Sequence, residues 1–143
     1  MIEDLYRQVI LAHYRQPANR HPLESANLTG YAHNPLCGDE LTVYGQVDDD
    51  RLADASFEAR GCSIVYASAD MMIDAVRGQP LDEVARQIDA FESMLEGPDE
   101  EPSVSLGDLR VLREVRKFPI RIKCALLPWR TLREALLQSR PRK

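Results

Sequence analysis

Apolar residues recur with helical spacing from the start of the chain, at Ile2, Leu5, Tyr6, Val9 and Ile10. This stripe predicts an amphipathic helix over residues 2–14 that ends before Pro17. Proline, asparagine and glycine then recur from residue 16 to residue 36. Their density predicts an extended or looped connector that leads to Cys37.

Two alternating runs of apolar and polar residues follow, over residues 41–47 and 53–60, with an acidic turn at 48–50 between them. Period-two alternation predicts two half-buried antiparallel strands joined as a hairpin. After Cys62 the apolar spacing changes to the helical period and continues to Val76. Cys62 is therefore expected at a strand-to-helix junction.

Helical spacing returns over residues 81–96 and again, more briefly, over 106–115. A last helix carries Trp129 and several leucines. Because proline fits only the first turn of a helix without loss of a backbone hydrogen bond, Pro128 predicts that this helix begins near Cys124.

Composition narrows the class of protein. The chain of 143 residues fits a single domain, 1–143, and its formal net charge of −5 disfavours nucleic acid as a partner. No apolar run approaches the roughly 20 residues that span a bilayer. The first residues lack the basic and apolar regions of a secretory signal, so we expect a cytoplasmic protein without a membrane partner. Three cysteines argue against a disulfide framework and leave metal binding, catalysis or inert burial open.

Four residues could form a metal centre: Cys37, Asp39, Cys62 and Cys124. Three thiolates and one carboxylate suit tetrahedral zinc, and iron also accepts such ligands. The carboxylate, as the hard ligand, would be the easiest to displace. The basic residues Arg121 and Lys123 would help to stabilise a thiolate at Cys124. Buried, unreactive cysteines remain an alternative, since no CxxC pair occurs.

Three motifs in order along the chain carry a family resemblance: Asn34-Pro35-Leu36-Cys37-Gly38-Asp39, Gly61-Cys62-Ser63-Ile64, and Lys117-Phe118-Pro119-Ile120-Arg121-Ile122-Lys123-Cys124. With these motifs the chain resembles the SufU branch of the IscU/NifU N-terminal-domain proteins of iron–sulfur cluster assembly. The resemblance extends over nearly the whole chain.

This resemblance implies an α+β fold in which a small antiparallel sheet of about three strands packs against helices. It also implies that Cys37, Asp39, Cys62 and Cys124 bind Zn²⁺. Proteins of the SufU branch accept persulfide sulfur from a SufS-type cysteine desulfurase and supply a downstream iron–sulfur assembly scaffold. IscU-like relatives instead assemble and transfer a [2Fe-2S] cluster, which is the alternative function and would replace zinc by iron or a cluster.

Two departures from the scaffold branch favour the SufU-like function. Lys123 stands where scaffolds have histidine, and residues 80–111 resemble the extra segment of SufU-like proteins. The resulting hypothesis is at most a zinc-dependent sulfurtransferase that acts with a desulfurase. Cys37 is the favoured sulfur acceptor and Cys124 the alternative, while Arg121 would dock the partner or assist ligand exchange.

Overall fold

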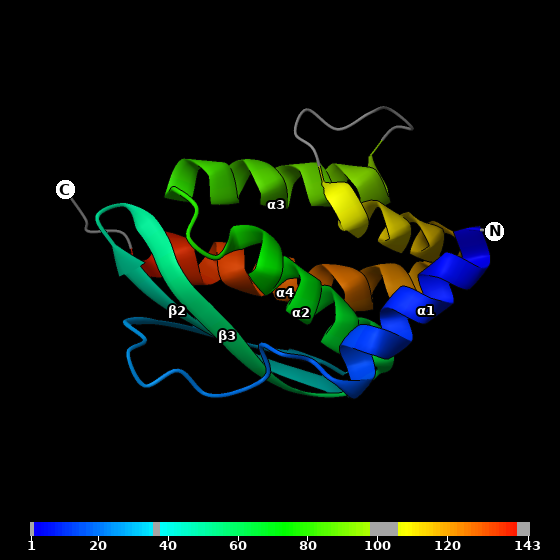
Figure 1. Ribbon diagram of the computed structural model, residues 1–143, viewed down its shortest axis with the longest axis horizontal. Coiled ribbons are helices and arrows are strands. Elements are labelled where there is room, and N and C mark those ends of the chain that lie inside the picture. The colour runs from blue at the N-terminus through cyan, green and yellow to red at the C-terminus, as the bar shows by residue number, and fades with distance from the viewer. Residues whose placement is uncertain (1, 36–37, 98–105, 140–143) are drawn as a thin grey trace.

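A three-stranded antiparallel sheet and the helices stacked on it form the frame of the protein (Figure 1). The computed structural model describes residues 2–35, 38–97 and 106–139. The elements, in chain order, are α1 (Ile2–Arg15), β1 (Leu28–Asn34), β2 (Asp39–Asp48), β3 (Arg51–Arg60), α2 (Ser63–Val76), α3 (Leu81–Glu96), the 3₁₀ helix η1 (Gly107–Lys117) and α4 (Pro119–Ser139). Helices α2 and α4 pack against the sheet, and α3 and η1 pack against α4. The α+β class expected from the sequence is confirmed.

Strand β1 lies inside the segment that was expected to be an extended or looped connector. It pairs antiparallel with β2, so the sheet has the order β1-β2-β3. Residue Gly30 hides this strand from a pattern analysis because it looks like a turn residue, yet it serves packing. A Cβ atom at Gly30 would lie 3.0 Å from both the Thr131 carbonyl oxygen and the Ala135 Cβ, so glycine allows α4 to approach the strand.

The acidic hairpin turn between β2 and β3 lies where it was expected. Asp49 and Asp50 have φ angles of 50° and 60°, in the left-handed region that aspartate tolerates better than most residues. The sharp turn sets the antiparallel register that brings the far end of β3 beside the start of β2.

Element η1 corresponds to the short helix expected over residues 106–115. Four buried apolar residues of this segment recur every three positions, at Leu106, Leu109, Leu112 and Val115, and Val111 is buried beside them. A 3₁₀ helix has three residues per turn, so this spacing places the four repeating residues on one face. The exact three-residue repeat therefore favours a 3₁₀ helix over an α-helix here.

Helix α4 starts earlier than its sequence suggested. Pro119 is its first residue, so Pro128 lies in the helix interior and Cys124 lies beyond the first turn. The expectation that the helix begins near Cys124 is wrong, because a proline that fits a helix start was already present at Pro119. The carbonyl group of Ala125, which lies in the turn before Pro128, accepts a hydrogen bond of 2.6 Å from the Ser68 hydroxyl. A neighbouring helix thus bonds to the backbone near the proline.

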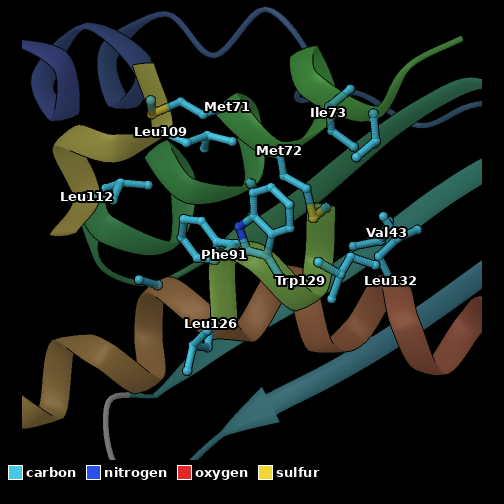
Figure 2. Packing of buried hydrophobic residues seen from close by; sticks show 14 of the residues in the cluster. Val43, Met71, Met72, Ile73, Phe91, Leu109, Leu112, Leu126, Trp129 and Leu132 are labelled. Atoms are coloured by element: carbon cyan, nitrogen blue, oxygen red, sulfur yellow. The ribbon is translucent and has the colours of Figure 1, made fainter. Parts of the chain in front are cut away.

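The core is centred on Trp129, which is fully buried (Figure 2). Its ring stacks on that of Phe91 from α3, with centroids 4.3 Å apart and an interplanar angle of 12°. Its indole N–H donates a 3.0 Å hydrogen bond to the Ser68 hydroxyl. One side chain thus joins α2, α3 and α4, which fixes the helix that carries Cys124.

Charged residues link α3 to the outer side of α4, and we call them the α3–α4 ladder: Asp89, Glu92, Glu96, Arg130 and Arg133. Glu92 is central, at 2.9 Å from the Arg130 Nε and 3.1 Å from an Arg133 Nη. Partial burial raises the pKa of Glu92, but hydrogen bonds and charge from the two arginines outweigh it and lower the pKa below its usual value.

Candidate metal centre

Three of the four predicted ligands converge in the fold. An oxygen of Asp39 and the sulfurs of Cys62 and Cys124 all lie within 4.8 Å of one another. They come from the start of β2, the residue that caps the N-terminus of α2, and the second turn of α4. The fourth predicted ligand, Cys37, lies outside the described residues.

Asp39 is the most constrained member of this group. Its side chain is fully buried, and each carboxylate oxygen faces one cysteine. Oδ1 accepts a 2.9 Å hydrogen bond from the Cys62 backbone N–H, and Oδ2 lies 3.3 Å from the Cys124 Sγ, whose thiol donates to it. A buried carboxylate needs such partners to offset its loss of water. The carboxylate is therefore held in one orientation, with Oδ2 pointing to the Cys124 sulfur.

The pairing of β2 with β3 produces this orientation. Because Glu40 pairs with Arg60, the next residues, Asp39 and Gly61, face each other at the end of the ladder. A Cβ atom on Gly61 would lie only 2.1 Å from Asp39 Oδ1, and Gly61 also has a φ of 150°, which L side chains rarely adopt. Glycine is thus required both by the turn and by the carboxylate. The Gly61-Cys62 pair at the end of a strand was a signal in the sequence for a special turn. The sequence did not show that Asp39 lies opposite this glycine.

The donor set fits a zinc ion. Tetrahedral zinc with bonds of about 2.0 Å to oxygen and about 2.3 Å to sulfur separates an oxygen and a sulfur ligand by about 3.5 Å. The observed separation of 3.3 Å between Asp39 Oδ2 and Cys124 Sγ is close to that value. Oδ1 would keep its hydrogen bond to Cys62, which is the kind of outer contact that orients metal ligands. The described residues could therefore hold three corners of a tetrahedral site.

The two cysteines differ in access. Cys124 is 1% exposed, whereas Cys62 is partly exposed and caps the N-terminus of α2. Since Cys124 lies beyond the first turn of α4, the dipole of its own helix has little effect on it. Arg121 and Lys123 are both exposed, and the guanidinium of Arg121 lies 5.1 Å from the centre of the Phe118 ring.

A second group of ligand-type residues, His13, Asp70 and Asp74, serves the fold. The ring of His13 donates a 2.5 Å hydrogen bond from Nδ1 to Asp70 Oδ2. Asp70 Oδ1 accepts hydrogen bonds from both the backbone and the side-chain nitrogen of Asn19. Both oxygens of Asp70 are thus occupied, and the cluster ties α1 and the following connector to α2.

The fold and the centre place the chain among the proteins of iron–sulfur cluster assembly. It belongs to the NifU-like N terminal domain family, which matches residues 5–125. The family resemblance seen in the sequence is confirmed.

Individual relatives agree. The chain is 39% identical to the zinc-dependent sulfurtransferase SufU of Bacillus subtilis, over 96% of this chain and 93% of that protein. It is 35% identical to the iron–sulfur cluster assembly scaffold protein IscU of Streptococcus pyogenes, over 96% of this chain and 86% of that one. The crystal structure of FiSufU from Fervidobacterium islandicum superposes with a TM-score of 0.85 at 33% identity, covering 90% of this chain and 94% of that one.

Within the part of the chain that the structure describes, none of the helices combines the length and hydrophobicity needed to cross a membrane.

Proposed function

We propose that this protein is a zinc-bound acceptor and carrier of sulfur, which it takes as persulfide from a SufS-type cysteine desulfurase for iron–sulfur cluster assembly. The observation that carries the proposal is the buried Asp39 carboxylate that faces both Cys62 and Cys124. The 39% identity to a zinc-dependent sulfurtransferase supports the same conclusion. Sulfur would pass on to a downstream assembly scaffold in the cytoplasm.

The metal would be held by Asp39, Cys62 and Cys124, with Cys37 as the fourth ligand. When bound, zinc keeps its cysteine ligands deprotonated and close together. Asp39 holds the backbone of Cys62 in place. It is also the one hard ligand among sulfurs, and hence the one that a partner displaces at least cost.

Sulfur transfer itself is a thiol–disulfide type of exchange. The acceptor thiolate attacks the terminal sulfur of the donor persulfide, a new S–S bond forms, and the old S–S bond breaks. The terminal sulfur keeps its proton, and the donor cysteine leaves as a thiolate, so no oxidant or reductant is consumed. Cys37 is the proposed acceptor, because the burial of Cys124 would keep a donor from reaching that alternative sulfur. Arg121, which is exposed, would dock the partner.

The test combines the purified protein with a SufS-type desulfurase and radiolabelled cysteine. We expect one zinc per chain and labelled persulfide on the acceptor, located by alkylation and peptide mass spectrometry. Asp39→Ala should lose zinc and sulfur transfer, whereas the exposed Asp82→Ala should retain both. If zinc is lost and transfer continues at the original rate, the proposal is wrong.

A scaffold function is the second candidate, supported by the 35% identity to a protein named as a cluster scaffold. Anaerobic reconstitution with iron and sulfide separates the two functions. A stable [2Fe-2S] absorption spectrum, together with no stimulation of the desulfurase, would favour the scaffold.

A further inference from the structure

A cavity of about 360 Å³ lies beside the candidate metal centre. Ser63, the residue after Cys62, forms part of its wall. Apolar side chains of α1, α2 and the segment before α4 form one part of the rest, and charged residues form another; the apolar ones are Ile10, Leu11, Ile64 and Phe118. The cavity therefore reaches the start of α2, next to Cys62, through a partly apolar space.

Tyr6 lines this cavity, and its buried hydroxyl group has no hydrogen-bond acceptor among the described residues. A buried polar group without a partner costs free energy, so such a group calls for an explanation. Burial raises the pKa of this phenol. A side-chain hydrogen bond and the positive charge of Arg121 oppose the rise, and the nearby Cys62 and Glu114 add to it. Tyr6 is thus a protonated O–H donor beside the centre that lacks an acceptor.

The charges around the cavity favour an anion. Glu114 and Lys117 pair with each other at 3.3 Å, and the other two charged residues of the wall, Arg7 and Arg121, are both cationic. Apolar walls disfavour small, strongly hydrated anions, whereas a sulfur anion on an alkyl arm is large, polarisable and weakly hydrated. A hydrogen-bond donor, a cation and an apolar wall together suit such a group.

From this arrangement we infer that the cavity holds the persulfide of the sulfur donor and that the Tyr6 hydroxyl donates a hydrogen bond to its inner sulfur. The inference rests on the proposed function. When the acceptor thiolate attacks the terminal sulfur, the negative charge moves to the inner sulfur, which leaves as the donor's thiolate. Tyr6 keeps its proton and stabilises that charge where it develops, as a preorganised donor does in other transfer reactions.

The test is Tyr6→Phe, which removes only the hydroxyl. Tyr14→Phe is the matched control, because Tyr14 lies on the same helix and its edge contact with Tyr66 needs no hydroxyl. Sulfur transfer is measured from two donors: free cysteine persulfide, and a SufS-type desulfurase that carries a persulfide. Removal of one preorganised donor should slow transfer about tenfold or more.

We expect Tyr6→Phe to slow transfer from both donors, while its zinc content and its unfolding midpoint stay at or above those of the unchanged protein. A hydroxyl with a merely structural role would lower the unfolding midpoint or the zinc content when it is removed, whereas loss of a buried hydroxyl that lacks an acceptor does not destabilise a protein. A second variant, Leu11→Trp, fills the cavity and should slow transfer from both donors as well.

A normal transfer rate from either donor in Tyr6→Phe would overturn the inference. In particular, if Tyr6→Phe slows transfer from the desulfurase alone, the cavity recognises the donor protein and not its persulfide. If the unchanged protein accepts no sulfur from either donor, the proposed function itself fails, which is a different result.

Discussion

Gly61→Ala should disturb the metal centre without touching a ligand. The new Cβ atom would lie 2.1 Å from Asp39 Oδ1, so the carboxylate must move by about 1 Å to reach ordinary contact. That movement breaks the hydrogen bond from the Cys62 N–H to a charged acceptor, which is worth roughly 1.5–3 kcal/mol. The φ of 150° adds roughly 1–3 kcal/mol of strain for alanine.

We therefore expect Gly61→Ala to lower the free energy of unfolding by roughly 2.5–6 kcal/mol. Gly78→Ala is the matched control, because Gly78 also has a positive φ, of 79°, but no atom lies within 4 Å of its added Cβ. That control should cost only the backbone strain, about 1–2 kcal/mol. The difference between the two variants isolates the displaced carboxylate.

Two assays measure the effect. Denaturant unfolding in the presence of a chelator reports the stability of the metal-free protein, and competition with a chromophoric chelator reports zinc affinity. Loss of a contact that orients a ligand should weaken zinc binding about 10- to 100-fold in Gly61→Ala and leave it unchanged in Gly78→Ala. If both variants show the same stability and the same zinc affinity, the reasoning about Asp39 is refuted.

Two further predictions concern the fold. Ser68→Ala removes the acceptor of the Trp129 N–H and the donor to the Ala125 carbonyl, so it should lower the free energy of unfolding by about 1–3 kcal/mol. Denaturant unfolding followed by Trp129 fluorescence measures the effect, and an unchanged midpoint would contradict this network. Glu92→Gln weakens the α3–α4 ladder. Because the pKa of Glu92 is lowered in the folded state, the ionised carboxylate contributes to stability above about pH 4.5, and this contribution is lost as the pH falls through the lower folded pKa. The ladder is partly exposed, so we expect less than about 1 kcal/mol at neutral pH. A difference in stability between the two proteins that widens toward pH 3 would contradict the assignment.

Local patterns predicted the elements whose spacing is regular. The helix over residues 81–96 agrees with α3, and the short helix over 106–115 agrees with η1, although its 3₁₀ character was not predicted. The errors came from residues with two uses. Gly30 looked like a loop residue but makes room for α4, and Pro128 looked like a helix start but lies inside the helix, since Pro119 begins it.

The sequence alone determined the chemistry of the centre: which residues offer sulfur or carboxylate, and that Cys62 ends a strand and caps a helix. Tertiary structure alone decided how they meet. Asp39 is separated by 23 residues from Cys62 and by 85 from Cys124, and no local preference acts over such distances. The strand register sets Asp39 against Gly61, and the packing of α4 on the sheet brings in Cys124. The orientation of the carboxylate follows from burial, because a buried charge must take the hydrogen bonds that its neighbours offer.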